Sequence, residues 1–253
     1  MSDSFWREGF GPLLPHADFV PFGDLDALEQ KLRHKRMAAF FVEPVQGEAG
    51  IQIPPAGYLR AAQQLCRRYG TLFVADEVYS SVYDSLKRSI VHTSTFGENG
   101  LAMRAGLATL DVLEREDLGR RATALGEDLR SRLRDALSSY EMIREIRGLG
   151  LMCGIEFSAP SRLSLRIPFE AFRGIHAGIF GQVLVMRLFR DSGILTQMCG
   201  NNFMVLKAAP PLTASPEHTG VFVEAMRSAV ELAHSPGAFW SEGRGLARRA
   251  VNV

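Results

Sequence analysis

The chain has 253 residues, 46% of them apolar and 23% charged, with a formal net charge of +1. This length allows one large domain or two smaller ones, and the near-neutral charge gives no electrostatic basis for binding nucleic acid or an anionic membrane. No apolar run reaches the roughly 18 residues of a membrane span, and the first residues contain no apolar signal-peptide segment. Three scattered cysteines, Cys66, Cys153 and Cys199, have neither disulfide nor metal-site spacing and indicate a reducing compartment, so we expect a cytoplasmic location and no metal.

The first third of the chain predicts part of a parallel sheet. Its expected elements are a helix at about 25–34, a strand at 37–42, a helix at about 58–69 and a strand at 72–75. Asp24 suits the N-cap of the first helix, and Gly70 suits the C-cap of the second. A strand, a helix and a strand in this order form a parallel pair through a right-handed crossover. Because both strands are uninterrupted apolar runs, we expect them to be buried on both faces.

Three carboxylates follow these strands. Asp76 stands where the second strand ends, and Glu43 and Glu48 lie in the glycine-containing loop after the first. Ligands of open α/β sheets bind outside the carboxyl ends of the strands. Asp76 is therefore a candidate ligand-binding residue, with capping of the next element as its alternative role.

The middle of the chain predicts one long helix at about 101–139, after a polar segment and a small-residue loop at 92–100. Within it, leucines recur every four residues between charged residues. These leucines are Leu125, Leu129, Leu133 and Leu137. Gly119 is the expected interruption, and Gly126 is interpreted as a glycine that the helix tolerates.

The last part of the chain predicts a smaller α+β domain. Its expected elements are a strand at 151–157, an irregular stretch at 158–180, a helix at 182–192, short strands at 194–198 and 203–208 that form a hairpin, a helix from 215 to about 233, and an amphipathic tail at 239–253. Gly154 is expected to allow close packing. The composition changes near 140–150, which predicts a partial large domain at 1–140 and a C-terminal small domain with its tail at 141–253.

Six motifs together carry a family resemblance. They are Phe41-Val-Glu-Pro-Val-Gln-Gly-Glu-Ala-Gly-Ile51, Leu72-Phe-Val-Ala-Asp-Glu-Val78, His92-Thr-Ser-Thr-Phe-Gly97, Leu107-Ala-Thr-Leu-Asp-Val-Leu113, Arg147-Gly-Leu-Gly-Leu-Met152 and Ala209-Pro-Pro-Leu212. Each motif alone is weak, but all six occur in the family's order and cover most of residues 37–233. The chain thus resembles the class III aminotransferases of the ornithine, acetylornithine and 4-aminobutyrate type, which are dimeric fold-type I enzymes that use pyridoxal phosphate.

This resemblance implies an α/β fold with an incomplete fold-type I large domain, whose sheet is mostly parallel, and a smaller C-terminal α+β domain. It implies transfer of an amino group from an amino donor to a keto or aldehyde acceptor through pyridoxal 5'-phosphate. It also implies a homodimer or association with a paralogue.

The resemblance assigns three cofactor-binding residues. Asp76 matches the carboxylate that pairs with the protonated pyridine nitrogen, an arrangement that keeps the ring a good electron sink. Val78 matches a residue that packs against the cofactor ring, and Thr95 matches the threonine that reaches the cofactor phosphate of the neighbouring subunit. The alternatives are a core valine at position 78 and a simple turn or helix cap at Thr95.

The resemblance also assigns three substrate-binding residues. Glu43 and Glu48 match acidic positions near the substrate site, with loop surface as the alternative. Lys207 stands where family members often have the arginine that binds the substrate α-carboxylate. A lysine is a point charge without the bidentate fork of arginine, so recognition of standard α-amino acids is in question.

Two departures from the family bear on catalysis. Family members have further residues before the position of Met1, including those that grip the phosphate. A block of several tens of residues, including the strand with the Schiff-base lysine, also has no counterpart after Val78. The chain has four lysines, Lys31, Lys35, Lys87 and Lys207, and none has the expected surroundings. Transamination needs that lysine both to hold the cofactor and to shuttle a proton, so no catalytic lysine is assigned and activity is expected to be impaired.

Three functional hypotheses remain open from the sequence. The first is a class III aminotransferase fragment or deletion variant. The second is a non-catalytic homologue that dimerises with, or regulates, a complete aminotransferase. The third is an enzyme of another class on a rebuilt α/β fold, with Asp76, Glu43 and His92 as acid and base groups.

Overall fold

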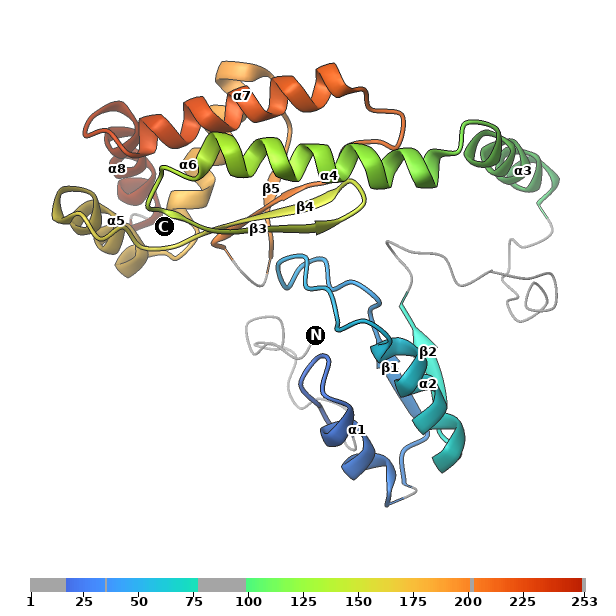
Figure 1. Cartoon of the computed structure of the whole chain (residues 1–253). Helices are drawn as coiled ribbons and strands as arrows, with labels where there is room; N and C mark the ends of the chain where they lie inside the picture. Colours follow the sequence, from blue (N-terminus) through green and yellow to red (C-terminus); the bar gives the residue numbers. More distant parts are fainter. Residues whose placement is uncertain (1–16, 35, 77–98, 201–202, 252–253) are drawn as a thin grey trace. The chain divides into compact units, whose positions relative to one another are not determined.

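The structure is a computed structural model that describes residues 17–34, 36–76, 99–200 and 203–251 (Figure 1). The chain divides into two compact units. Unit 1 contains the described residues of 1–47 and 52–93, and unit 2 contains residues 48–51 together with the described residues of 94–253.

Unit 1 is built on a parallel strand pair, as the sequence predicts. Its elements are α1 (Leu25–Leu32), β1 (Ala39–Val42), α2 (Tyr58–Tyr69) and β2 (Leu72–Ala75). β1 and β2 are parallel, in a register that runs from Ala39 opposite Leu72 to Val42 opposite Ala75. Both predicted caps are confirmed: the Asp24 carboxylate accepts a hydrogen bond from the Ala27 amide at 2.8 Å, and Gly70 has a φ of 73°.

The prediction that these strands are buried on both faces is wrong for the described part of the chain. Phe40 and Phe73 lie on the same face and pack against Leu28, Leu32, Ala62 and Cys66 of the two helices. On the other face Phe41 is 71% exposed and Leu72 is 69% exposed. The two helices share one hydrophobic cluster, so within unit 1 they cover only one face of the sheet.

Unit 2 begins with two helices, α3 (Gly100–Arg115) and α4 (Leu118–Leu137), where the sequence predicts one. The interruption lies at Glu116 and Asp117, not at Gly119, which is inside α4. Asp117 has a φ of 46°, a left-handed conformation that aspartate tolerates better than most residues and that stops helix propagation. The leucine series of α4 is buried, as predicted.

Gly126 is not merely tolerated in α4. A Cβ atom at this position would lie 1.8 Å from the backbone oxygen of Gly150. The helix and the turn after the next strand are therefore in direct backbone contact, and only glycine permits that approach.

A four-stranded antiparallel sheet forms the second layer of unit 2. It contains β3 (Ile143–Leu149), β4 (Met152–Phe157), β5 (Gln197–Met198) and β6 (Val205–Ala208), in the order β3-β4-β6-β5. The sequence predicts β4 and the antiparallel pairing of β5 with β6, but it misses β3. β3 runs through Gly148, which is paired in the sheet with Cys153, although glycine is uncommon inside a strand.

The described residues of unit 2 form four further helices. They are α5 (Leu163–Ile175), α6 (Ile179–Ser192), α7 (Pro216–Ala233) and α8 (Ala238–Val251). The prediction of an irregular stretch at 158–180 is wrong, because α5 forms despite Pro168 and buries Leu165, Phe169 and Phe172 at helical spacing. In Figure 1, α7 runs along α4. The tail forms α8, with Phe239 and Trp240 in the core.

These helices and one face of the sheet enclose the main hydrophobic core. Ile146, Cys153, Ile155 and Leu206 point from the sheet into this core. α4 belongs to unit 2, where it packs on β3 and α7, so the compact units differ from a division at residues 140 and 141. As a division of the family fold, 1–140 and 141–253 stays a prediction. Among the described residues, no helix combines the length and apolar character that crossing a membrane requires.

Candidate functional site

Unit 1 brings two of the predicted site residues to one edge of its sheet. Glu43 and Asp76 directly follow the paired residues Val42 and Ala75, at the carboxyl ends of the parallel strands. The Asp76 amide donates a hydrogen bond to the Val42 carbonyl at 2.8 Å, and its side chain is exposed. The Glu43 carboxylate accepts a hydrogen bond from the Gly47 amide at 3.2 Å, so it also closes its own loop.

Unit 2 has a polar sheet face, on the side opposite the hydrophobic core. In antiparallel strands, directly opposed residues point to the same face and alternate residues share it. Arg147 is opposite Gly154, which is opposite Lys207, and Gln197 is opposite Lys207 from the other side. The polar side chains of this face, here called the polar sheet face, are those of Glu145, Arg147, Glu156, Gln197 and Lys207, and the apolar Val205 lies opposite Glu156 on the same face.

Residues 48–51, here called the tip, belong to unit 2 and lie on this polar sheet face. The Glu48 carboxylate forms an ion pair with the Lys207 ammonium group and accepts a hydrogen bond from the Gly200 amide at 2.7 Å. The Gly50 carbonyl accepts a hydrogen bond from Arg147 Nε at 2.9 Å. The fold thus joins Glu48 and Lys207, two residues that the sequence assigns to the substrate site from positions 159 residues apart.

Electrostatics keep the Glu48 carboxylate of this pair ionised. The Lys207 side chain is only 8% exposed. Burial of Glu48 acts to raise its pKa, but the hydrogen bonds from Lys207 and from the Gly200 amide outweigh burial and lower the pKa below its usual value. A buried ammonium group is costly without a negative partner. Lys207 therefore suits the exchange of the Glu48 carboxylate for another anion.

Cys199, a further residue near this pair, does not fit a nucleophilic role. Its side chain is fully buried, and burial raises its pKa to about 11. The thiol is therefore protonated at neutral pH, and a thiolate is the form that attacks an electrophile.

The backbone of the tip is strained. Ile51 has a φ of 53°, a left-handed conformation that a β-branched residue adopts at a cost of about 1–3 kcal/mol. Its side chain is fully buried over Gly154, where a Cβ atom would lie 3.3 Å from the Ile51 Cβ. The predicted close packing at Gly154 is thereby confirmed, and its partner is the strained residue of the tip.

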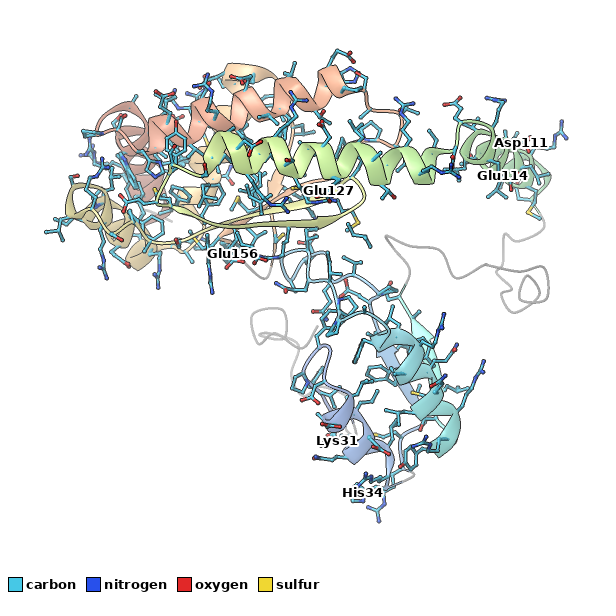
Figure 2. The ribbon with its side chains drawn as sticks, in the orientation of Figure 1. Lys31, His34, Asp111, Glu114, Glu127 and Glu156 are labelled. Atoms are coloured by element: carbon cyan, nitrogen blue, oxygen red, sulfur yellow. The ribbon has the colours of Figure 1, made fainter. Side chains whose placement is uncertain are left out.

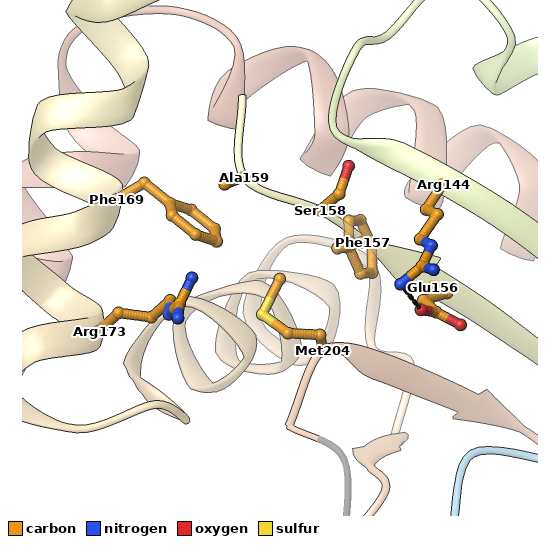
Figure 3. Close-up of a pocket in the computed structure, with 8 residues that line it drawn as sticks. All are labelled: Arg144, Glu156, Phe157, Ser158, Ala159, Phe169, Arg173 and Met204. Atoms are coloured by element: carbon orange, nitrogen blue, oxygen red, sulfur yellow. Dashed lines mark hydrogen bonds and ion pairs between the residues drawn. The ribbon is translucent and has the colours of Figure 1, made fainter. Parts of the chain in front are cut away.

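Unit 2 also contains two open cavities, one near the end of β4 and one beside α6 and β5. The first has a volume of about 300 Å³ and is lined by Arg144, Glu156, Phe157, Ser158, Ala159, Phe169, Arg173 and Met204 (Figure 3). In Figure 3, Arg144 points at Glu156, and their ion pair spans 2.9 Å. The second, of about 530 Å³, is lined partly by Thr196, Met198 and Cys199. Neither cavity contains a predicted site residue.

The other predicted residues fall in two groups. Val78, Thr95, Lys87 and His92 lie outside the described residues. Lys31 lies on α1, where its Nζ is 2.9 Å from the Asp18 carboxylate (Figure 2). Sequence reasoning missed Arg147 and Glu156, although Arg147 opens one of the six motifs. A hairpin turn placed at Gly150 would have paired Arg147 with Gly154 and revealed the polar sheet face.

The chain belongs to the class III aminotransferase family. The family model described as "Aminotransferase class-III" matches residues 2–82 and 80–230. The two matches meet at 80–82, close to the junction that the sequence predicts after Val78. The fold is accordingly that of the fold-type I aminotransferases, with a partial large domain and a smaller α+β domain.

Among the relatives are several ornithine aminotransferases. The mitochondrial ornithine aminotransferase of Arabidopsis thaliana is 33% identical over 273 aligned residues, covering 91% of this chain and 54% of the relative. The crystal structure of the ornithine aminotransferase from Toxoplasma gondii ME49 has a TM-score of 0.73 at 27% identity, over 92% of this chain and 60% of that one. The acetylornithine aminotransferase from Elizabethkingia anophelis gives a TM-score of 0.65 at 26% identity, over 89% and 62%.

The chain spans between half and two thirds of the length of these relatives. The 273 positions aligned with the Arabidopsis protein exceed the 253 residues of this chain, so that relative has residues that face none here.

The family depends on pyridoxal phosphate, and the described residues alone do not fit this cofactor completely. Asp76 offers a carboxylate at the carboxyl end of a parallel strand, which suits the pyridine nitrogen. The two described lysines are both held in ion pairs, Lys31 with Asp18 and Lys207 with Glu48, and Lys207 lies on an antiparallel strand of unit 2. We assign no reaction step through the cofactor.

Proposed function

We propose that this chain is an aminotransferase-derived protein that binds the substrates of its family and is impaired in catalysis. The family reaction moves an amino group from an amino donor to a keto or aldehyde acceptor by means of pyridoxal phosphate. In this proposal Asp76, Val78 and Thr95 contact the cofactor, Lys207 binds the substrate carboxylate, and Glu43 and Glu48 are the acidic substrate-site positions, of which Glu48 occupies Lys207 when substrate is absent. The family match supports the reaction class. The impairment is supported by the four lysines of the sequence, because none of them has the surroundings of the family's Schiff-base lysine.

The observation that carries the substrate proposal is the ion pair between Lys207 and Glu48. Lys207 is the buried cation of the polar sheet face, and Glu48 is anchored to it from a loop rather than from the sheet. A substrate carboxylate can therefore take the place of Glu48 on Lys207 without disturbing the strands. The ligand class that fits is a carboxylate such as a 2-oxo acid.

Calorimetric titration with 2-oxoglutarate tests this assignment. We expect Lys207→Gln to abolish binding, because a neutral amide leaves the carboxylate without its cation. We expect Glu48→Gln to bind more tightly than the unaltered chain, because the internal competitor is gone. Arg173→Gln, on the exposed side of α5, is the matched control and should bind normally. Equal binding by Lys207→Gln and the unaltered chain would refute the assignment.

Borohydride reduction tests the proposed impairment. After incubation with pyridoxal phosphate, a complete ornithine aminotransferase should give a stoichiometric reduced adduct on one lysine, visible by absorbance and located by mass spectrometry. For this chain we expect only weak labelling of exposed lysines. A stoichiometric adduct at Lys87 would identify a relocated Schiff-base lysine and overturn the proposal.

Self-association and a cytoplasmic location are part of the same proposal. Four apolar residues of α3, namely Leu101, Met103, Leu107 and Leu110, are each more than half exposed and suit burial against another chain. Light scattering after gel filtration measures this association, and binding to a complete aminotransferase would instead favour the regulatory alternative.

Three free cysteines support a reducing compartment, although the Arabidopsis relative is mitochondrial.

A further inference from the structure

Arg147 connects the polar sheet face to the tip. Its Nη1 contacts the carboxylates of Glu145 at 2.7 Å and Glu156 at 2.5 Å, while its Nε donates to the Gly50 carbonyl at 2.9 Å. The side chains of Arg147 and Glu156 are 13% and 12% exposed, so this arrangement is largely withdrawn from water. The two carboxylates fix the guanidinium group, and the guanidinium group fixes the backbone two residues after Glu48.

The tip needs such a restraint because its backbone is strained. Gly50 has a φ of 103° and Ile51 a φ of 53°. A strained turn persists only where its surroundings hold it. Arg147 holds the Gly50 carbonyl from one side, and the burial of Ile51 over Gly154 holds the next residue. Both contacts act on the residues that deliver Glu48 to Lys207.

We propose that Arg147 is a positioning residue that keeps Glu48 on Lys207 and so lowers the affinity of this site for an anionic substrate group. The effect on substrate rests on the proposed function, whereas the effect on Glu48 does not. The Arg147 guanidinium group donates a hydrogen bond to the Gly50 carbonyl of the tip. It acts through the Gly50 carbonyl, by limiting how far the tip can move from the sheet.

The sign of the effect separates this role from simpler ones. If Arg147 acted only through its positive charge, its removal would weaken the binding of an anion to Lys207. If Arg147 acted as a positioning residue, its removal would release Glu48 and strengthen that binding. A general structural role would loosen the whole of unit 2 and would speed hydrogen exchange in its helices α4 and α7 as well.

Lysine labelling provides a test that does not need substrate. The chain has four lysines, so acetylation by an N-hydroxysuccinimide ester can be followed at each one by mass spectrometry. We expect Arg147→Gln to raise the labelling rate of Lys207 several-fold and to leave Lys31 unchanged. Arg147→Lys should act in the same way, because one ammonium group cannot hold two carboxylates and the Gly50 carbonyl together.

Arg144→Gln is the matched control. Arg144 lies on the same hairpin and contacts Glu156 at 2.9 Å, so it shares a carboxylate partner with Arg147. We expect it to leave Lys207 labelling at the level of the unaltered chain. Unchanged labelling of Lys207 in Arg147→Gln, or a rise at Lys207 accompanied by faster hydrogen exchange in α4 and α7, would overturn the proposal.

Gly154→Ala tests the same tip from its other side, and remains informative if Arg147→Gln does not fold. The new methyl group would lie 3.3 Å from both Ile51 and Val205, so it presses on the tip by a few tenths of an ångström while Arg147 stays intact. We expect faster labelling of Lys207 here too. Unchanged labelling would contradict the proposal that the tip keeps Glu48 on Lys207.

Titration with 2-oxoglutarate then connects positioning to function. We expect several-fold tighter binding to Arg147→Gln than to the unaltered chain, and weaker binding would overturn the positioning role in favour of a charge effect. If labelling responds as expected but no variant binds 2-oxoglutarate, the positioning of Glu48 stands and the proposed substrate class fails.

Discussion

The two sheets of this protein are each covered by helices on one face within their own unit, but only one of them has a sequence suited to that arrangement. In unit 2 the face away from the core carries charged residues such as Arg147, Glu156 and Lys207. In unit 1 the face away from α1 and α2 carries Phe41 and Leu72, which are 71% and 69% exposed. An antiparallel sheet tolerates one solvated face, whereas parallel strands are normally covered on both.

This difference indicates that unit 2 is more stable on its own than unit 1. The core of unit 2 joins residues from its helices and sheet into one large cluster, which includes Leu133, Ile155, Phe169 and Trp240. The hydrophobic cluster of unit 1 joins only four buried residues of the part of the chain that the structure describes, namely Leu28, Leu32, Ala62 and Cys66. Hydrophobic stabilisation follows buried apolar area, so we expect unit 1 to unfold first.

The largest expected effect comes from Gly126→Ala in unit 2. The new methyl group would collide with the Gly150 backbone oxygen, so α4 must move off the β3–β4 turn, and we expect a loss of about 3 kcal/mol or more. Gly119→Ala, an exposed glycine of the same helix with open space around it, should be neutral or stabilising by up to about 1 kcal/mol. Denaturant unfolding compares the two variants. Equal stability would show that the close approach at Gly126 is wrong.

Leu28→Ala should reveal whether unit 1 unfolds separately. Leu28 is 2% exposed in the small cluster of unit 1, and its truncation should cost about 2–3 kcal/mol because the site can partly collapse. Hydrogen exchange followed by mass spectrometry should show faster exchange in α1 and α2 with no change in α4 and α7. Faster exchange throughout both units would break the comparison and indicate one cooperative fold.

Glu242→Gln tests how strongly the tail helix is fastened to unit 2. Glu242 is 15% exposed and forms ion pairs with Arg187 and Arg190 of α6. Burial acts to raise the pKa of Glu242, but these arginines outweigh it and lower the pKa. A carboxylate with a lowered pKa in the folded state stabilises the fold above its ordinary pKa near 4.5, and loses this contribution as the pH falls through the lower value.

We therefore expect Glu242→Gln to lose about 1–2 kcal/mol of stability at pH 7, with the difference from the unaltered chain shrinking as the pH falls below 4.5. Thermal unfolding measured from pH 7 to pH 3 gives this profile. Glu224→Gln, which removes an exposed ion pair on α7, is the matched control and should cost less than about 0.5 kcal/mol. A pH-independent difference for Glu242→Gln would contradict the assigned charge state.

The smallest expected effect on stability comes from the double variant Phe41→Thr and Leu72→Thr. Both side chains are exposed, and threonine suits a strand, so unfolding should change by no more than about 0.5 kcal/mol. Self-association measured by light scattering should decrease, because the apolar face of the unit 1 sheet is removed. A large loss of stability would show that this face is covered in solution.

Local signals predicted much of the fold. Asp24 and Gly70 marked helix ends correctly because caps depend on neighbouring backbone groups alone. The leucine series of α4 likewise predicted its buried face. The predictions failed where contacts between distant residues decide the local structure. α5 forms around Pro168 because Phe169 and Phe172 enter the core. Gly126 is required because a turn 24 residues later touches the helix.

The candidate site shows the same division. By itself, the sequence determined the family, the elements that bear Asp76, Glu43, Glu48 and Lys207, and the small number of lysines, because these follow from residue identity and order. Only the tertiary structure decided that Glu48 forms an ion pair with Lys207. It also decided that Arg147 donates a hydrogen bond to the Gly50 carbonyl of the tip. Strand register and a strained turn set those contacts, and neither is written in any short stretch of the chain.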